Sequence, residues 1–573
     1  MSSTSTPEQI LRTAVSHHQA GDVTEAARLY RHVLEHDPNQ ADALNLLGVI
    51  VQQAGDLDQA LHLFDQASAA APGLATVPFN KANALRGADR EEEALAAYKT
   101  ALDINPEYAD ARLNLGALLH DRGNTQAAIA QFNNLLKAAP GHAKGHYNLG
   151  KCRQTQGRLD DAQVALTKAI ELDANDADAH FALANVLADL GKFEQAIAQI
   201  KIAINLRPNW PEANTNWANY LCELDLQEDA LEKYEHALTL SPSNANATVN
   251  KAFALLSLGK LHDGWDCYKV RHESSAPGFA SLNNSIPMWQ GESLSDKRVL
   301  VLGEQGLGDE ILYASMLQEF SRETRQCILA CSTKLVPLFK KTFAIGSNIE
   351  IVDRKKDDLS GDQFDVQTTF IDIGKHCRPS LRSFPPAVQY LAADREQVAS
   401  LRDTYQAQFG KNKVLVGISW ASGNPTIGRN KSIPLENWSP VLEHQDLQFI
   451  SLQTGKACGD LETAQADIRQ AVYTDPNLPI EDDIQSALCQ LAVMDLVITC
   501  SNTTAHLSGA SGRPTWVVLP TGRSRIWYWF KGQNPCPWYP QVRLYQKSKA
   551  ASWRAIMGQV GQDLGQLPDR SDI

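Results

Sequence analysis

The first half of the chain repeats itself every 34 residues, and this period constrains the fold more than any other feature. Prolines recur at this step, with Ala174 in the one vacant slot, at Pro38, Pro72, Pro106, Pro140, Pro208 and Pro242. The step also separates Ala26, Ala60, Ala94, Ala128, Ala162, Ala196 and Ala230. Four positions after each alanine stands a bulky residue, in order Tyr30, Phe64, Tyr98, Phe132, Leu166, Ile200 and Tyr234. Two helices approach closely only where a small residue faces the partner, so the pattern predicts stacked helix pairs.

The repeat resembles the tetratricopeptide repeat family. That family's Leu–Gly/Ala pair in the first helix is matched at Leu47-Gly48, Leu115-Gly116, Leu149-Gly150, Leu183-Ala184 and, with a tryptophan, Trp217-Ala218. The resemblance implies seven full repeats over residues 7–244. An eighth begins at Ala245, and in it Gly264 replaces the usual alanine. We therefore expect an α-solenoid over residues 7–272.

Solenoids of this kind present a long concave face that binds extended peptides. Asparagines recur in the first helices, and they are candidates for gripping the backbone amides of a protein or peptide partner: Asn45, Asn80, Asn114, Asn148 and Asn214. They could equally be solvated polar positions. The sequence leaves both interpretations open.

The C-terminal half has a different pattern. Residues 273–295 are rich in Ser, Gly, Asn and Pro and are expected to form a linker. Beyond them, short apolar runs alternate with amphipathic segments, which indicates parallel α/β sheets. The runs form two groups separated by a helix expected near 394–409. We therefore expect two Rossmann-like lobes, 296–395 and 410–573, with a ligand cleft between them.

Composition excludes several classes of protein. A formal net charge of −13 argues against general binding of nucleic acid or anionic membranes. No apolar run is long enough to span a bilayer, and the N-terminus lacks the features of a secretory signal. Ten scattered cysteines without a CxxC pair agree with a cytoplasmic location. No His/Cys/Asp cluster has metal-ligand spacing, so neither a metal nor a cofactor is expected.

The stretch GEQGLGDE, residues 303–310, follows a strand and opens a helix. Its turn contains Gly306 and Gly308 but has neither the GxGxxG of dinucleotide sites nor the GK[ST] of a P-loop. Asp309 stands where the turn becomes helix. An acidic residue there can simply complement the helix dipole, or it can do chemistry in a cleft.

A second junction, residues 495–520, runs from a strand ending at Cys500 into another helix. Asn502, Thr503 and Thr504 supply amide and hydroxyl groups at the first turn of that helix. Together with free backbone N–H groups they could seat a diphosphate. Ordinary N-capping is the other interpretation.

Five stretches together resemble GT-B glycosyltransferases of the heptosyltransferase type. They are GEQGLGDEILYASML, VGISWASGNPTIGRNKSIPLENWSPVL, FISLQTG, MDLVITCSNTTAHLSGASGRPTWVVLP and WYWFKGQNPCPWYPQVRLYQK, and they cover most of residues 298–547. The whole architecture resembles bacterial tetratricopeptide proteins that carry such a domain, and is similar to O-linked N-acetylglucosamine transferases. The resemblance implies a solenoid followed by a GT-B-like pair of lobes. It also implies metal-independent, inverting transfer from a nucleotide sugar to a protein or glycan.

The resemblance also implies roles for single residues. Asp309 would be the base that takes the acceptor's proton, and Lys431 would neutralise phosphate charge. Gln453 would contact the nucleotide or the sugar. His506 would hydrogen-bond a diphosphate oxygen, or it would be an interior histidine that holds the loop. Heptosyltransferases commonly have Asp-Thr-Gly where this chain has Ser501-Asn502-Thr503, so the resemblance leaves the donor sugar open.

Two functions of different classes remain. One is a glycosyltransferase whose repeats recruit the acceptor. The other is a non-catalytic interaction scaffold with a degenerate glycosyltransferase-like domain. Stabilisation by a nucleotide sugar would separate them, because only a protein with a donor site gains stability from the ligand.

Overall fold

The structure, a computed structural model, describes residues 6–273, 282–283, 285–424, 426–478, 483–548 and 551–566. The chain forms two compact units, Met1–Pro208 and Asn209–Ile573. Residues 274–281 and 284 of the expected linker lie outside the described residues.

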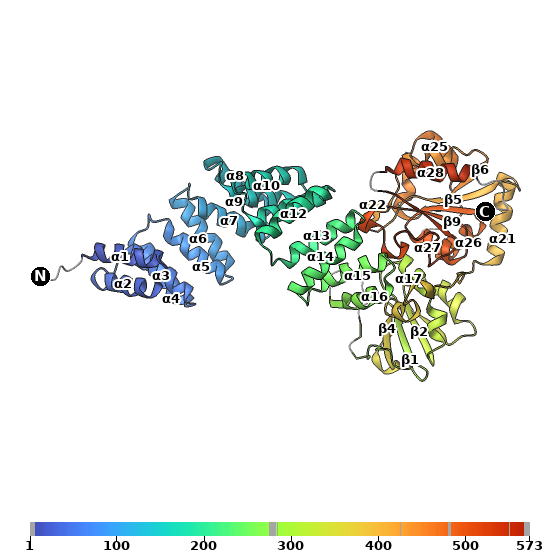
Figure 1. Cartoon of the computed structure of the whole chain (residues 1–573), viewed down its shortest axis with the longest axis horizontal. Helices are drawn as coiled ribbons and strands as arrows, with labels where there is room; N and C mark the ends of the chain where they lie inside the picture. Colours follow the sequence, from blue (N-terminus) through green and yellow to red (C-terminus); the bar gives the residue numbers. More distant parts are fainter. Residues whose placement is uncertain are drawn as a thin grey trace. The chain divides into compact units, whose positions relative to one another are not determined.

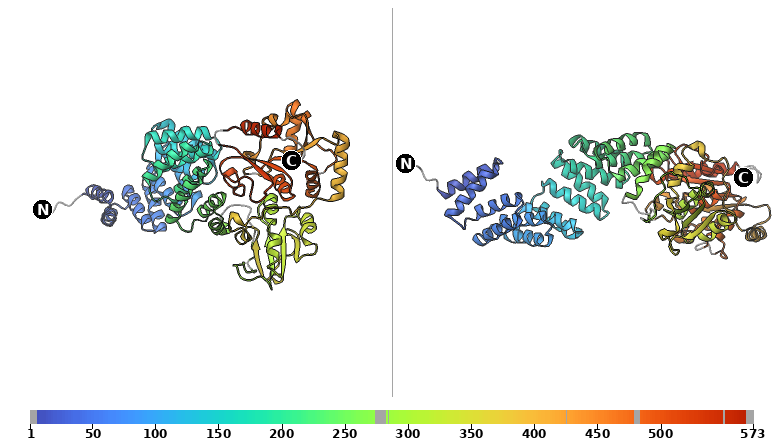
Figure 2. Two further views of the ribbon diagram at one scale, coloured as in Figure 1. Left: turned by 45° about the vertical axis from the view of Figure 1, so that its right-hand side comes forward. Right: turned by 90° about the horizontal axis from the view of Figure 1, so that it is seen from below.

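Sixteen helices form eight hairpins in the described stretch between Pro7 and Tyr268. The first unit contains α1 (Pro7–Gln19), α2 (Val23–His36), α3 (Ala41–Gln53), α4 (Leu57–Ala70), α5 (Thr76–Gly87), α6 (Glu91–Ile104), α7 (Ala109–Asp121), α8 (Thr125–Ala138), α9 (Ala143–Thr155), α10 (Leu159–Leu172), α11 (Ala177–Asp189) and α12 (Phe193–Leu206). The second unit begins with α13 (Pro211–Glu223), α14 (Gln227–Leu240), α15 (Ala245–Ser257) and α16 (Leu261–Tyr268). The predicted repeats are therefore confirmed, and Figure 2 shows successive hairpins of the first unit packed side by side.

The expected pairing of small and bulky residues is also confirmed. All seven alanines of the 34-residue series are fully buried. A Cβ added at Gly48 would lie 2.8 Å from the Phe64 ring, and one added at Gly116 would lie 2.6 Å from the Phe132 ring. The first helix of each of these repeats therefore touches the second through its glycine.

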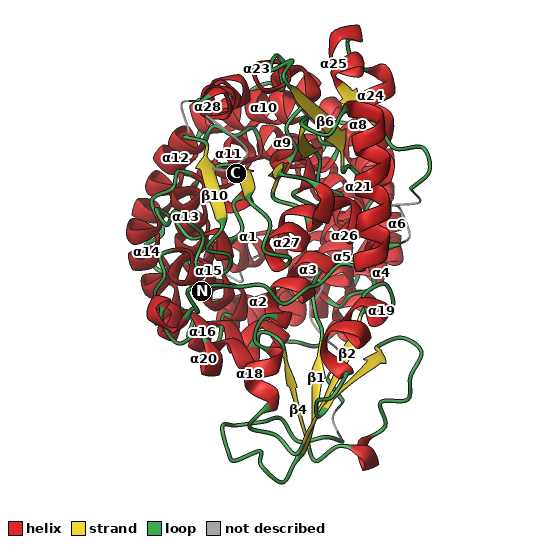
Figure 3. Ribbon diagram, turned by 90° about the vertical axis from the view of Figure 1, so that its right-hand side faces the viewer, coloured by secondary structure: helices red, strands yellow, loops and turns green. Residues whose placement is uncertain are grey.

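Ten strands form two parallel sheets in the described part of the second unit. They are β1 (Arg298–Leu302), β2 (Gln326–Cys331), β3 (Ile349–Asp353), β4 (Val366–Thr369), β5 (Val414–Ser419), β6 (Leu447–Ser451), β7 (Val472–Tyr473), β8 (Leu496–Cys500), β9 (Thr515–Leu519) and β10 (Val542–Gln546). The first sheet has the order β3-β2-β1-β4, and the second has the order β10-β9-β8-β5-β6-β7. Counted from its own first strand, the second sheet has the 3-2-1-4-5-6 order of doubly wound Rossmann sheets. Figure 3 shows the two sheets as separate groups of strands.

Pairing in both sheets is in register and parallel, as the alternation of strands and helices predicts. Val299 lies opposite Cys327 on one side and Val366 on the other, and Val416 lies opposite Phe449 and Leu496. The strand β10 lies inside the aromatic block near the end of the chain, where the sequence pattern predicts no strand. It completes the second sheet beside β9.

The helices of the second unit flank these sheets (Figure 1). They are α17 (Leu307–Ala314), α18 (Leu317–Ser321), α19 (Val336–Phe339), α20 (Asp372–Cys377), α21 (Arg395–Phe409), α22 (Gly428–Lys431), α23 (Ser439–Leu442), α24 (Asp460–Thr463), α25 (Ala466–Ala471), α26 (Ile484–Val493), α27 (Thr503–Ala510) and α28 (Trp553–Gly565). The helix expected near 394–409 is α21. None of the helices in the described ranges combines the length and hydrophobicity that a bilayer crossing requires.

The last two helical hairpins, α13–α16, pack with the α/β lobes. The indole N–H of Trp265 donates to the carbonyl of Arg378 over 2.9 Å, and the Lys531 backbone N–H donates to the carbonyl of Ser257 over 2.7 Å. Arg525 forms an ion pair of 2.8 Å with Asp225. These contacts group the seventh and eighth repeats with the lobes, whereas the sequence pattern alone places residues 7–272 in one domain.

Candidate functional site

Two strands of the second sheet end where the strand order reverses, which is the place where ligands bind in doubly wound sheets. Asn502, two residues after β8, bridges to the end of β5. Its amide nitrogen donates to the Ser419 hydroxyl over 2.8 Å and to the carbonyl of Ala421 over 3.1 Å. Its amide oxygen accepts the Ala505 N–H, so Asn502 also caps α27. The predicted N-capping therefore occurs, and the capping residue also fixes the crevice.

Gln453 has a similar structural position after β6. Its amide oxygen accepts hydrogen bonds from the Ser419 hydroxyl and from the N–H groups of Trp420 and Ala421, all within 3.0 Å. Its amide nitrogen donates to the carbonyl of Thr454 over 2.9 Å. The polar atoms of Gln453 are thus occupied by the chain, and the side chain shapes the loop after β5.

Lys431, at the end of α22, is the buried cation of the site. Its residue is only 4% exposed. Within the part of the chain that the structure describes, the ammonium makes no hydrogen bond or ion pair. Burial lowers the pKa of Lys431, and the nearby Cys500 and Asp309 act in the opposite direction. Because most of the Lys431 residue is buried, an anion placed beside its ammonium would be favourable.

The start of α27 adds hydrogen-bond donors close to the end of β8. Asn502 satisfies only the N–H of Ala505, so the N–H groups of Thr503 and Thr504 have no intrahelical acceptor. Thr504 is buried and Thr503 is half-buried. These groups and the positive end of the helix dipole favour a negative charge at this position.

Asp309 lies in the first turn of α17, in the other lobe. Its carboxylate accepts the N–H of Gly306 over 3.0 Å, so the predicted dipole-complementing role is present. The carboxyl also lies near the Tyr528 hydroxyl and the charge of Lys431, both of which favour its ionised form. Burial raises the pKa of Asp309, and the Gly306 N–H, Lys431 and Tyr528 partly offset that effect.

His506 lies one turn into α27 and is an interior histidine. It is 2% exposed, its two ring nitrogens lie 3.3 Å from the hydroxyls of Tyr528 and Tyr539, and its ring stacks on Trp529. Burial and the charge of Lys431 lower the pKa of His506 to about 3, so the imidazole is neutral near pH 7. Of its two predicted roles, the structure shows the histidine that holds the loop.

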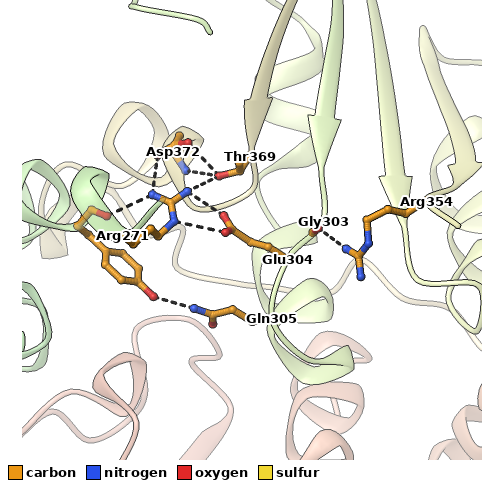
Figure 4. Close-up of polar contacts among 8 residues, drawn as sticks. Arg271, Gly303, Glu304, Gln305, Arg354, Thr369 and Asp372 are labelled. Carbon is orange, nitrogen blue, oxygen red and sulfur yellow. Dashed lines mark hydrogen bonds and ion pairs between the residues drawn. The ribbon is translucent and has the colours of Figure 1, made fainter. Parts of the chain in front are cut away.

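Sequence reasoning missed a buried ionic cluster centred on Arg271, in the short helix η1 (Lys269–Glu273) that follows α16. The guanidinium forms ion pairs of 2.9 Å with Glu304 and with Asp372, and donates to the Thr369 hydroxyl over 2.6 Å (Figure 4). Glu304 follows β1, and Thr369 ends β4. Arg271 therefore lies where the strand order of the first sheet reverses, between β1 and β4. No local sequence motif predicts this position.

Further contacts on both sides of Glu304 hold the turn before Asp309. Gln305 has a φ of +66°, unusual for a side chain other than glycine, and its amide donates to the Tyr268 hydroxyl over 2.7 Å. On the other side, Arg354 donates to the carbonyl of Gly303 and forms an ion pair of 2.8 Å with Glu310. Residues of the last repeat and of the first lobe together fix the turn.

The candidate asparagines of the repeats mostly bond to the chain itself. The amide of Asn80 donates to Asn45 and that of Asn114 donates to Asn83, each over 3.0 Å. Asn148 and Asn214 donate to the carbonyls of Lys144 and Trp210, four residues earlier, over 3.1 Å and 2.9 Å. Asn45 and Asn214 are buried, while the others are half-buried. Only the half-buried asparagines expose surface that a peptide could reach.

Among the described residues, no group of three or more His, Cys, Asp or Glu side chains is arranged to hold a metal ion.

Comparison with known proteins identifies the repeats. A tetratricopeptide repeat model matches residues 17–76, 119–166 and 153–215, and a TPR repeat model matches residues 82–123. Protein FlbA of Caulobacter vibrioides is 30% identical over 334 residues, which cover 54% of this chain and 53% of that protein. The chain thus spans about half the length of this curated relative.

Solved structures that resemble the chain include two repeat proteins. YrrB, described as a TPR protein with an unusual peptide-binding site, is 21% identical, with a TM-score of 0.28 over 32% of this chain and 94% of its own. A tetratricopeptide repeat protein from Parabacteroides merdae is 18% identical, with a TM-score of 0.35 over 44% of this chain and 98% of its own. The family matches and the paired helices show that the N-terminal half is an array of tetratricopeptide repeats.

Proposed function

We propose that this chain is a glycosyltransferase of GT-B architecture, which moves a sugar from a nucleotide-sugar donor to a protein or glycan acceptor recruited by the repeats. The observation that carries the proposal is Lys431, a largely buried lysine whose ammonium bonds to no described residue and lies near the end of β8 and Asp309.

The donor's diphosphate would lie against Lys431 and the first turn of α27. Lys431 supplies a full positive charge, and the N–H groups and hydroxyls of Thr503 and Thr504 supply hydrogen bonds. As the bond between the sugar and the phosphate breaks, its electron pair passes to the phosphate oxygen. Positive charge already in place stabilises that developing charge. Asn502 and Gln453 keep this crevice in shape.

Asp309 would serve as the base. The acceptor hydroxyl attacks the anomeric carbon of the sugar, and its proton passes to the Asp309 carboxylate. Attack opposite the departing diphosphate inverts the configuration at that carbon. The acceptor would approach over Gly306, whose residue is exposed at the start of α17.

A second candidate function is a protein-interaction scaffold without transfer activity. One observation favours it: the side-chain amides of Asn502 and Gln453 already form hydrogen bonds within the chain. Under this alternative, Asp309 acts only as the cap of the turn through its bond to the Gly306 N–H.

Thermal unfolding of the full chain with UDP-, GDP-, ADP- and dTDP-sugars tests the proposal. A donor at ten times its dissociation constant adds about 1.4 kcal/mol to the stability of the protein that binds it. We expect one nucleotide class to raise the melting temperature and Lys431→Met to abolish the shift. Lys456→Met, which changes an exposed lysine of the same lobe, is the matched control and should retain it. No shift with any donor would support the scaffold instead.

A further inference from the structure

The loop after β9 joins the second sheet to the last two repeats. It contains the short helix η7 (Gly522–Ser524), which lies against α13. The backbone N–H of Arg523 donates to Oε2 of Glu223 over 3.2 Å, and Nη2 of Arg523 donates to Oδ1 of Asn250 over 3.0 Å. An arginine of the α/β lobe therefore bonds to residues of both the seventh and the eighth repeat.

Other contacts fix the position of this loop. Gly522 has a φ of +64°, and a Cβ added there would collide with the Glu223 carboxylate. Arg525, which is 6% exposed, forms its ion pair of 2.8 Å with Asp225. The backbone that carries Arg523 is thus held in place before a ligand arrives. Binding to Arg523 therefore orders little of the chain, which lowers the entropic cost of binding.

Asn250 occupies a position that recurs in the first helices of the repeats. Ala182 takes the one vacant slot in a series of asparagines with the 34-residue step, namely Asn80, Asn114, Asn148, Asn216 and Asn250. Asn45 and Asn214 do not fall in this register. Within one compact unit, residues at the same position of successive repeats lie on the same face, and such faces bind partners. Arg523 therefore lies beside the member of this series in the last repeat.

The side chains of Arg523 and Asn250 leave hydrogen-bond donors for a ligand. A guanidinium has five N–H groups, and within the described residues that of Arg523 makes only the bond to Asn250. Asn250 accepts through its oxygen, so its amide nitrogen remains a donor, and no described residue accepts from it. Arg523 is exposed and Asn250 is half-buried, so both side chains are accessible to a ligand.

Arg523 also has no ion-pair partner among the described residues. Glu223 uses Oε2 to accept the backbone N–H of Arg523, and Asp225 is paired with Arg525. The charge of Glu223 reduces the field of the guanidinium but leaves its N–H groups available. The junction between the repeats and the lobe therefore presents a cation with open donors.

Open donors select a ligand that presents oxygen atoms. A carboxylate fits a guanidinium best, because its two oxygens accept two parallel N–H groups. The faces of repeat arrays bind extended peptides, and aspartate and glutamate are the carboxylates that a peptide carries along its length. We propose that Arg523 and Asn250 bind the carboxylate of an acidic side chain in an extended peptide.

This site lies next to the candidate donor site. The Ser524 hydroxyl accepts a hydrogen bond from the Asn430 amide over 3.3 Å, and Asn430 directly precedes Lys431. A peptide held by Arg523 is thus anchored beside the helix that carries Lys431. That this peptide is the sugar acceptor rests on the proposed function, whereas its binding at Arg523 does not.

Fluorescence anisotropy of the full chain with two labelled peptides tests the site without any nucleotide sugar. One peptide alternates serine with glutamate, and the other alternates serine with glutamine. We expect the wild type to bind the glutamate peptide about tenfold more tightly, because only a carboxylate forms charge-assisted hydrogen bonds with Arg523. The net charge of −13 opposes this preference, so general electrostatic attraction does not explain it. Arg523→Met should abolish the preference. Arg523→Lys keeps the charge but loses the fork, so it should retain only part of the preference.

Arg554→Met is the matched control, because Arg554 is an exposed arginine of α28 in the same unit. It should keep the wild-type preference. Asn250→Asp places a carboxylate beside the guanidinium and should abolish the preference, so it serves if Arg523→Met does not fold. Equal affinity of the wild type for the two peptides, including binding of neither, would overturn the inference. A preference that survives in Arg523→Met would also overturn it.

The donor phosphate is the other anion that could use Arg523. If Arg523→Met lost stabilisation by a nucleotide sugar and kept the peptide preference, Arg523 would belong to the donor site and the inference would be wrong. A peptide preference in a protein that no nucleotide sugar stabilises would contradict the proposed transfer function alone.

Discussion

Gly308 of α17 lies against His506 of α27, so closely that a Cβ at position 308 would be 2.7 Å from Cδ2 of the imidazole. This contact joins the helix that carries Asp309 to the helix that carries Thr503. Any larger residue at position 308 therefore requires His506 or one of the two helices to move. The two glycines named from the sequence differ in this respect, since an added Cβ at Gly306 meets only the carboxylate of Asp309, at 3.2 Å.

Gly308→Ala is expected to destabilise the second unit by about 1–3 kcal/mol, because His506 is packed on all sides and cannot yield. Chemical denaturation of the full chain measures the change. Gly558→Ala in α28 is the control, since nothing lies within 4 Å of an added Cβ there and alanine favours helix. Equal stability of the two variants would contradict the close contact.

His506 gives the folded state a dependence on pH. Its folded pKa of about 3 lies below its ordinary value of 6.5, so the unfolded chain binds a proton in this interval and the folded chain does not. Stability then rises with pH between about 3 and 6.5, by roughly 1.4 kcal/mol per pH unit from this residue. This contribution is complete above pH 6.5 and is lost as pH falls.

His506→Gln should remove that slope. Denaturation of wild type and variant at pH 7 and pH 5.5 measures it, and the difference in stability between the two proteins should shrink at the lower pH. Carboxylates and the other histidines contribute equally to both proteins and cancel in the difference. A constant difference across this interval would show that the folded state protonates His506 as readily as the unfolded chain does.

Arg271→Met is expected to destabilise the second unit by about 3–5 kcal/mol, because it leaves Glu304 and Asp372 buried without their cation. The variant should also loosen the turn at Gln305, next to Glu304. Arg271→Lys keeps the charge but loses the forked geometry, so it should fall between wild type and Arg271→Met. Denaturation midpoints of the three proteins give the order, and a wild-type midpoint for Arg271→Met would refute the role of the cluster.

The sequence predicts the repeats well because one physical requirement recurs at every period. In each repeat a small residue must face a bulky one. Gly116 faces Phe132 in the same way as Gly48 faces Phe64. The strands are also predictable, because buried parallel strands are short apolar runs. In contrast, β10 lies in a polar aromatic segment and escapes this criterion.

The candidate site is only partly predictable. The positions of Asn502 and Lys431 relative to the predicted strands place both residues at the correct edge of the sheet. They do not reveal that the Asn502 amide donates to the Ser419 hydroxyl. Arg271 is less predictable still, because its partner Glu304 lies 33 residues away and Asp372 lies 101 residues away. Local patterns carry no information about such pairs.

The repeats themselves offer a test of the packing rule. An alanine at position 116 would place its Cβ 2.6 Å from the Phe132 ring, so Gly116→Ala is expected to cost about 1–3 kcal/mol. Two periods later, Ala184 and Ile200 occupy the equivalent positions and both are fully buried. The chain thus already contains a compatible pair.

The double variant Gly116→Ala/Phe132→Ile reproduces that pair in the fourth repeat. Because the smaller isoleucine makes room for the alanine methyl group, and the methyl group fills part of the space left by the ring, the two changes should compensate. We expect the double variant to be more stable than the sum of the single variants predicts, by about 0.5–3 kcal/mol. Denaturation of the wild type, Gly116→Ala, Phe132→Ile and the double variant gives the coupling energy between the two changes. Strict additivity would mean that the two side chains do not share one packing site.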